Sequence, residues 1–347
     1  ASALPIPVSA VPPLLRPGAV AGGGASRDPA SISGRVSHNL PGRGYQGPVH
    51  AINPAGGEVE AVATVASIGD VPGTVELAVV VVPKGAVATV ARECAAKGVR
   101  SLVVISSGFA ETGAEGAERQ AELVSICRTA GMRLIGPNCL GIMNTDPSVR
   151  LNVTFGPSFP PHGRVGFMSQ SGALGLAVID HARALGIGLS SFVSVGNKAD
   201  ISGNDLLQYW EEDPATDVCV LYLESFGNPR KFARVARRVS RRKPIVAVKS
   251  GRSAAGARAT SSHTGALLAS SDVTVDALFR QAGVIRTDTL SELFDAVKLL
   301  ATQPLPGGSR VRACRASRPA SCAGRYRRPA GTRSMGGVWR RRATRGE

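Results

Sequence analysis

The stretch SSHTGALLAS, residues 261–270, places His263 among small residues just before an apolar run. The letters TGAL after this histidine nearly repeat the SGAL of residues 171–174. Both segments predict helix starts, and two helix N-termini facing one anion would supply N–H donors and positive dipole ends. A neutral imidazole in such a place is a competent nucleophile toward phosphorus. His263 is therefore either a phosphoryl carrier or an incidental surface or capping histidine.

The segment GFMSQSGALG, residues 166–175, is a second candidate for anion binding. An apolar strand runs into Ser169, Gln170, Ser171 and Gly172, and a helical pattern follows. The serine hydroxyls and the first helix amides would form an anion-binding nest. The alternative is a well-capped helix without a ligand, because serine is also a preferred N-cap.

Glu224 ends an apolar strand in YLES, residues 222–225. Sites of α/β proteins form at the carboxyl ends of strands, where this side chain is expected. A carboxylate there would accept a hydrogen bond from one imidazole nitrogen and orient the other. The alternative is a solvated glutamate at a strand end.

Glycines close the first apolar strand in GGGASRDP, residues 22–29. They would let the backbone approach a phosphate, and the following helix N-terminus would add donors. The NAD fingerprint GxGxxG is not met, because Arg27 stands at the third glycine and INPAG replaces the expected acidic residue. We expect a nucleotide-like ligand other than NAD, with a plain tight turn as the alternative.

Apolar strand patterns alternate with helical patterns along the chain, which predicts parallel sheets with right-handed crossovers. The fold class is α/β, a Rossmann-like domain followed by a flavodoxin-like domain. Residues 144–163 contain four prolines and no helical period, which indicates a linker or crossover. The expected division is a lead-in at 1–13, a Rossmann-like domain at 14–145, a linker at 146–162, a flavodoxin-like domain at 163–305 and a disordered Arg-rich tail at 306–347.

The net charge of +16 is concentrated near the end of the sequence. Residues 310–347 hold twelve Arg, no Lys and one acid, or 12 − 1 = +11, which leaves 29 − 24 = +5 for residues 1–309. The tail composition predicts disorder. Nucleic-acid binding through the tail is not favoured, because no recognition motif or interleaved aromatic residue accompanies the charge.

The six cysteines are scattered, with no CxxC pair and no Cys/His cluster, so a metal site is not expected. They are interpreted as small buried apolar residues of a reducing compartment. No stretch approaches the ~20 apolar residues of a membrane span. The proline-broken N-terminus is interpreted as a lead-in and not as a signal peptide, so a cytoplasmic location is expected. The remaining histidines are read as structural: His38, His50, His162 and His181.

Eight motifs occur in order: GASRDP, INP, VVP, IGPNCLGIMN, GFMSQSGALG, VSVGNKADI, YLES and SHTGAL. Over residues 14–305 the chain therefore closely resembles the nucleoside-diphosphate-forming acyl-CoA synthetases, which include the alpha subunit of succinyl-CoA ligase. The resemblance implies a CoA-binding domain followed by a flavodoxin-like ligase domain. It also implies conversion of acyl-CoA, phosphate and NDP to acid, CoA and NTP through a phosphohistidine.

The resemblance assigns roles to residues of this sequence. His263 matches the phosphohistidine and Glu224 the carboxylate that steadies it. Ala55 stands where the family commonly has a lysine, which leaves one contact to a CoA phosphate in question. Positions that match the surroundings of CoA are Gly24, Ser26, Arg27, Val82, Pro83 and Lys84. Positions that match the phosphate and thioester region are Asn138, Ser169, Gln170, Ser171 and Gly172.

Fused members of this family continue into an ATP-grasp domain, which this sequence does not show. The resemblance therefore implies an ATP-grasp beta-type partner, through which ATP or ADP and Mg²⁺ would enter, and an oligomer without membrane attachment. The alternative function is a non-catalytic sensor of CoA or acyl-CoA, as in relatives fused to an acetyltransferase. The presence of both His263 and Glu224 favours the enzyme.

Overall fold

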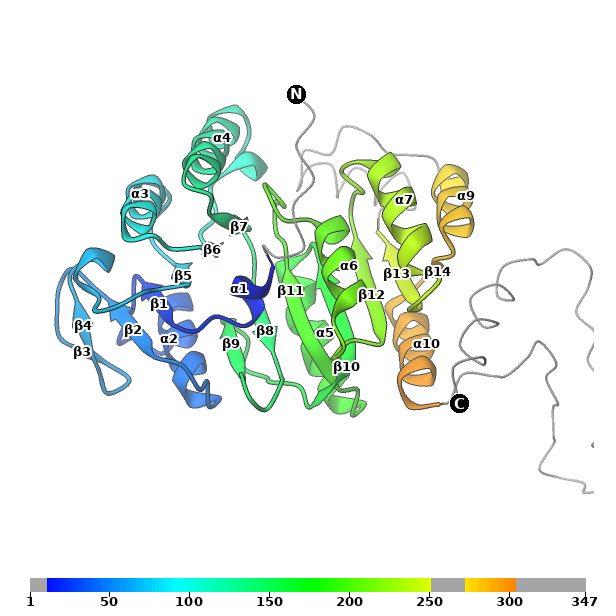
Figure 1. Ribbon diagram of the computed structural model, residues 1–347, viewed down its shortest axis with the longest axis horizontal. Helices are drawn as coiled ribbons and strands as arrows, with labels where there is room; N and C mark the ends of the chain where they lie inside the picture. Colours follow the sequence, from blue (N-terminus) through cyan, green and yellow to red (C-terminus); the bar gives the residue numbers. More distant parts are fainter. Residues whose placement is uncertain (1–10, 251–271, 304–347) are drawn as a thin grey trace, which may run out of the picture.

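The computed structural model describes residues 11–250 and 272–303. They form two seven-stranded sheets that lie side by side, each covered by helices on both faces (Figure 1). His263 and the tail at 306–347 lie outside the described residues, as does most of the expected lead-in.

The first sheet has the strand order β3-β4-β2-β1-β5-β6-β7. Its strands are β1 (Val20–Gly23), β2 (Val49–Ile52), β3 (Glu58–Val59), β4 (Val62–Val65), β5 (Leu77–Val80), β6 (Ser101–Val104) and β7 (Arg133–Ile135). All pairs are parallel except β3 with β4. Its helices are α2 (Ile32–Gly42), α3 (Val87–Lys97) and α4 (Ala114–Thr129).

Alternation along β5 explains how helices come to cover both faces of this sheet. Leu77 and Val79 pack in one core with Val36 of α2, whereas Ala78 and Val80 pack in another with α3 and α4. All four residues of β5 are buried. A strand buried on both faces loses the polar alternation of a half-exposed strand, which is why LAVVVV, residues 77–82, is one continuous apolar run.

The second sheet has the strand order β14-β13-β12-β10-β11-β8-β9. Strands β10 (His162–Ser169), β11 (Leu189–Ser194), β12 (Val218–Leu223), β13 (Ile245–Lys249) and β14 (Ile285–Thr287) are parallel. Strands β8 (Gly141–Asn144) and β9 (Leu151–Thr154) extend the sheet antiparallel. Its helices are α5 (Gly172–Ala184), α6 (Gly203–Glu212), α7 (Pro229–Val239), α9 (Asp272–Ala282) and α10 (Leu290–Thr302).

The segment expected as a linker at 146–162 differs from that expectation, because it contains strand β9. This strand is fully buried, and helix α2 of the first domain packs against it. The Asn39 side chain of α2 donates to the carbonyl oxygens of Thr154 and Gly156 at 2.8 Å each. The segment therefore joins the two domains as part of a sheet, and four residues are too short to show a period.

The start of the described chain is also ordered. Helix α1 (Pro12–Leu15) follows Val11, and its residues Leu14 and Leu15 are buried. The Asn144 side chain donates to the Leu15 carbonyl oxygen at 2.8 Å. The end of the expected lead-in thus packs between the domains, where α1 contacts β6 and β8.

The four cysteines of the described residues are buried, as the sequence predicts. Cys94, Cys127, Cys139 and Cys219 are buried and free, and burial raises the pKa of each thiol to about 12.

Within residues 11–250 and 272–303, no cluster of His, Cys, Asp or Glu could hold a metal ion. In the same described part, no helix is long and apolar enough to cross a bilayer.

Gly166 of β10 lies directly against the Trp210 ring in the core of the second domain. A Cβ at Gly166 would lie 2.5 Å from Cε2 of Trp210, which is fully buried and donates to Ser191 Oγ at 2.9 Å. We expect Gly166→Ala to lower the free energy of unfolding by ~1–3 kcal/mol through overpacking. Urea unfolding followed by circular dichroism measures this. In the control Gly85→Ala the new Cβ meets nothing within 4 Å, and equal midpoints for the two variants would contradict the prediction.

Candidate functional site

Three neighbouring strands of the second sheet deliver polar side chains to one edge. Gln170 follows β10, Lys198 follows β11, and Glu224 with Ser225 follows β12. Because these strands are parallel, their carboxyl ends meet, and this edge is where α/β folds form their sites. The structure thus brings the predicted segment Ser169–Gly172 together with Glu224.

Gln170 holds the end of β12 through both ends of its side-chain amide. Its Oε1 accepts hydrogen bonds from the backbone N–H groups of Glu224 and Ser225, the latter at 2.8 Å. Its Nε2 donates to the Ser225 carbonyl oxygen at 2.8 Å. The side chain is buried, so these bonds are protected from water. Gln170 therefore acts as a clamp between two loops of the candidate site.

Helix α5 begins at this edge of the sheet. Ser171 is its N-cap, and its side chain accepts a hydrogen bond from the Leu174 N–H at 3.3 Å. The capping alternative for Ser171 is therefore realised in the structure. A Cβ built on Gly172 would lie 3.5 Å from the Leu140 nitrogen, so the segment that follows Asn138 runs beside the first turn of α5. The positive end of the helix dipole faces this edge, which favours an anion.

Sequence reasoning missed Lys198 as a site residue. Its Nζ donates to the Ser225 carbonyl oxygen at 2.8 Å and to Ser225 Oγ. Burial lowers the pKa of Lys198 to about 8, and Lys249 at the end of β13 acts in the same direction, while Glu224 opposes the shift. The only signal in the sequence was a lone lysine in VSVGNKADI, and its partner lies 27 residues further along the chain.

Glu224 lies in a positively charged environment. Its charge raises the pKa of both Lys198 and Lys249, although burial has the larger effect and lowers the pKa of both ammonium groups. The predicted partner of Glu224, His263, lies outside the described residues. The pairing of these two side chains thus stays a prediction.

The turn after β1 lies against the loop after β5. Gly24 has a φ of 83°, and a Cβ at this position would lie 2.2 Å from the Val81 carbonyl oxygen. Only glycine accepts both the positive φ and this close approach. The backbone that leads to Ser26 is therefore brought directly beside Val82.

Polar groups order these first-domain loops. Ser26 Oγ accepts a hydrogen bond from the Asp28 N–H at 3.1 Å, and the Arg27 guanidinium donates to the Gly56 carbonyl oxygen at 3.3 Å. The Val82 N–H donates to Ser106 Oγ at 3.1 Å. The residues predicted to surround CoA thus come from the ends of adjacent strands β1 and β5, with Pro83 and Lys84 directly after Val82.

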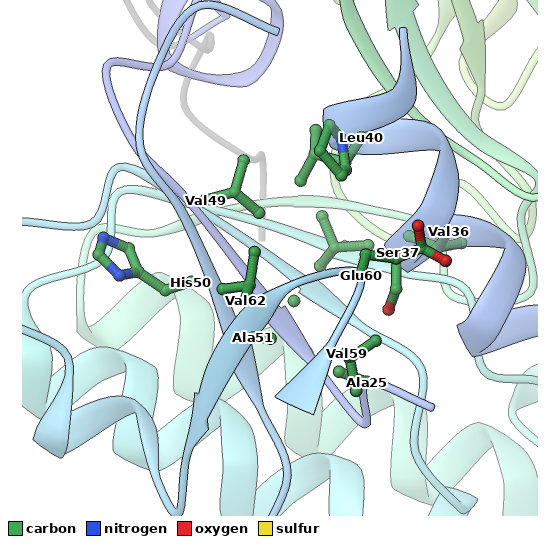
Figure 2. Close-up of a pocket in the computed structure, with 13 residues that line it drawn as sticks. Ala25, Val36, Ser37, Leu40, Val49, His50, Ala51, Val59, Glu60 and Val62 are labelled. Atoms are coloured by element: carbon green, nitrogen blue, oxygen red, sulfur yellow. The ribbon is translucent and has the colours of Figure 1, made fainter. Parts of the chain in front are cut away.

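A small hollow lies between helix α2 and the sheet in the first domain (Figure 2). Figure 2 shows Val36, Ser37 and Leu40 of α2 opposite Val49, Ala51 and Val62 of the strands. The lining residue Glu60 has its Oε2 atom 3.2 Å from Nδ1 of His38. Ala25, which precedes Ser26, also lines it. Most of its lining is apolar, and it contains none of the predicted phosphate or CoA residues.

Comparisons with known proteins agree with this architecture. A family model described as a CoA binding domain matches residues 19–145, and one described as a succinyl-CoA ligase like flavodoxin domain matches residues 162–300. The alpha subunit of acetate–CoA ligase [ADP-forming] I from Pyrococcus furiosus is 42% identical over 302 residues. The chain belongs to the nucleoside-diphosphate-forming acyl-CoA synthetase family. This membership confirms the resemblance and the predicted fold class.

The matched regions cover most of this chain and part of each relative. The Pyrococcus alignment covers 86% of this chain and 65% of the relative. Acetate–CoA ligase [ADP-forming] I from Archaeoglobus fulgidus is 43% identical over 83% of this chain and 41% of its own length. The dinucleotide forming acetyl-coenzyme A synthetase 1 of Ca. Korarchaeum cryptofilum, solved with phosphate and ADP, superposes with a TM-score of 0.82 at 42% identity, covering 86% of this chain and 64% of that structure. The chain thus spans about two fifths to two thirds of the length of these relatives.

Proposed function

We propose that this chain is the alpha-like portion of an NDP-forming acyl-CoA synthetase, an acid–thiol ligase that works through a phosphohistidine at His263. The observation that carries the proposal is the meeting of Gln170, Lys198 and Glu224 beside the N-terminus of α5. Family membership supports the same assignment. The catalytic pair of the proposal is His263 with Glu224.

The proposed reaction has two steps on this chain. A phosphate oxygen attacks the thioester carbonyl of acyl-CoA, and the thiolate leaves and takes a proton, which yields acyl phosphate and CoA. An imidazole nitrogen of His263 then attacks phosphorus, and the carboxylic acid leaves as carboxylate. Glu224 would accept the hydrogen bond of the other ring nitrogen, and Ser169–Gly172 with Asn138 would hold the phosphate. Positioning and N–H donors are what phosphoryl transfer requires.

CoA would lie at the strand ends of the first domain. The glycine at position 24 leaves the backbone open where any larger residue would collide with Val81. Ser26, Arg27 and the Val82–Lys84 segment would supply contacts to the CoA phosphates, because they carry hydroxyl, guanidinium, amide and ammonium donors. Ala55 supplies no such donor from its side chain.

The nucleotide step requires a site for ADP or ATP with Mg²⁺. We propose that an ATP-grasp beta-type partner binds ADP or ATP with Mg²⁺ and receives the phosphoryl group from His263, within an oligomer. A matching relative that is called a subunit alpha supports a separate partner chain. We further propose domains at 14–145 and 163–305, and a cytoplasmic location, which four buried free cysteines support.

Incubation with acetyl-CoA and phosphate tests the proposal directly. We expect acid-labile phosphate on His263, located by mass spectrometry, and none in the His263→Asn variant. Binding of CoA is measured in parallel by calorimetry. If CoA binds to the wild-type chain and His263 stays unmodified, the synthetase proposal fails and the CoA-sensor alternative replaces it.

A further inference from the structure

The loop at residues 195–201, between β11 and α6, is fastened to the first domain through its backbone. The N–H groups of Asn197, Ala199 and Ile201 donate to carbonyl oxygens of residues 137, 136 and 134 at 3.0, 3.2 and 3.2 Å. Gly196 has a φ of 51°, and a Cβ there would lie 2.4 Å from the Pro137 carbonyl oxygen. The loop thus forms a series of backbone hydrogen bonds with residues 134–137, from β7 and the segment that follows it.

Side-chain hydrogen bonds strengthen the same contact between the loop and the first domain. Asp200 accepts hydrogen bonds from Arg133 Nε at 2.8 Å and from the Leu134 N–H at 3.1 Å. The side chains of Arg133 and Asp200 are only 14% and 9% exposed. Asn197 Nδ2 donates to Glu111 Oε2 at 2.5 Å and to Gln120 Oε1 at 3.0 Å. The loop therefore takes its position from the CoA-binding domain.

The Lys198 side chain extends from this loop to the segment that follows β12. Its ammonium group and the Gln170 amide both donate to the Ser225 carbonyl oxygen. Burying an ammonium group costs free energy unless hydrogen bonds and an opposite charge compensate. Ser225 supplies the bonds and Glu224 the charge. The end of β12 is thus held from β10 by Gln170 and from β11 by Lys198.

We propose that Lys198 is a positioning residue for phosphoryl transfer: placed by the first domain, it holds the Glu224–Ser225 end of β12 where the carboxylate can orient the phosphoryl-carrying histidine. The inference rests on the proposed function of His263 and Glu224. It also makes the loop at 195–201 the physical connection between the CoA-binding domain and the phosphate site. Movement of this loop would displace Glu224 through Ser225.

Two substitutions at this position test the inference in the full chain. Lys198→Met keeps a long unbranched side chain and removes the charge and the hydrogen bonds, and Lys198→Arg keeps a cation. We expect Lys198→Met to slow phosphorylation of His263 by acetyl-CoA and phosphate by about 100-fold in single-turnover measurements, because small displacements of this kind have such effects. The CoA dissociation constant stays unchanged, and Lys198→Arg recovers most of the rate.

Lys243→Met is the matched structural control. Lys243 Nζ also donates to two backbone carbonyl oxygens, those of Trp210 and Asp213 at 2.5 and 2.7 Å, and burial also lowers its pKa. It precedes β13 and so lies at the opposite edge of the same sheet. We expect Lys243→Met to lower the unfolding midpoint without slowing phosphorylation. Equal slowing by the Lys198 and Lys243 variants would overturn the positioning role.

The pH profile supplies a readout that a purely structural role would not move. The charged groups that act on Lys198 are Glu224 and Lys249, and its pKa is about 8, so its positive charge is lost as the pH rises through 8. We expect the wild-type rate to fall there and the Lys198→Arg rate to stay level, because arginine keeps its proton. A wild-type chain that is never phosphorylated overturns the proposed function and this inference together. A phosphorylated wild type with an equally fast Lys198→Met variant overturns this inference alone.

Discussion

Replacement of Glu224 by glutamine is expected to slow phosphorylation of His263 by about 100-fold or more, since loss of an orienting carboxylate beside a reactive histidine has effects of this size. Glutamine keeps the shape of the side chain. The Gln170 clamp binds only backbone groups of Glu224 and Ser225, so it survives the substitution. The substitution therefore removes the carboxylate charge and leaves the backbone hydrogen bonds to Gln170 in place.

The same substitution has a second consequence, in the pH profile. Glu224 raises the pKa of Lys198 and Lys249 against the lowering effect of burial. Without the carboxylate both pKa values fall further, so the remaining activity should decline at a lower pH than in the wild type. Single-turnover rates between about pH 6 and about pH 9 cover the range around the lowered pKa of Lys198, which is about 8. Glu212→Gln, on an exposed side chain, is the control. A Glu224→Gln variant with the wild-type rate would remove Glu224 from the mechanism.

Replacement of Asp200 by alanine is expected to lower the free energy of unfolding by ~3–5 kcal/mol, because it leaves the Arg133 charge buried without its partner. Asp200 also accepts the Leu134 N–H, which would lose its bond. Arg133 Nη2 is already buried without a hydrogen-bond partner. Urea unfolding gives the loss of stability.

Glu122→Ala is the control for this second prediction. Glu122 pairs with Arg92 on exposed side chains, and loss of such a surface pair costs at most about 1 kcal/mol. Asp200→Ala should in addition slow phosphorylation under conditions where it is still folded, since the loop that carries Lys198 is released. Equal stability losses in the two variants would show that the Arg133–Asp200 pair does not join the domains as described.

Most of the strands and helices could be predicted because their patterns are local. LAVVVV, residues 77–82, is typical of a strand buried on both faces, and GAVATVARECAAKG ends on Gly98, which adopts the positive φ of a helix C-cap. The local patterns do not predict strands β9 and β14, because β9 lies in the segment expected as a linker and β14 lies between two helical patterns. Strand β9 is extended because it pairs with β8, and β14 because it pairs with β13. Neither segment has a local hydrophobic period that would predict a strand.

The candidate site could be predicted in part. Ser169–Gly172 and Glu224 were expected at strand ends, and parallel strand order places them at one edge. Lys198 could not be identified, because a single lysine in a polar loop looks like any solvated side chain. Its burial arises from its hydrogen bonds to Ser225, which follows β12, and from the contact of its own loop with the first domain.

By itself, the sequence determined the order of the elements, the two α/β domains and the residue types that phosphate chemistry needs. These depend on hydrophobic periodicity, glycine and capping signals, which act over a few neighbouring residues. Only the tertiary structure decided that residues 195–201 pair with residues 134–137, and that Lys198 and Gln170 hold the strand end beside Glu224. These hydrogen bonds join residues 27 to 67 positions apart. Such contacts form when packed strands bring the loops together, and they leave no periodic trace in the chain.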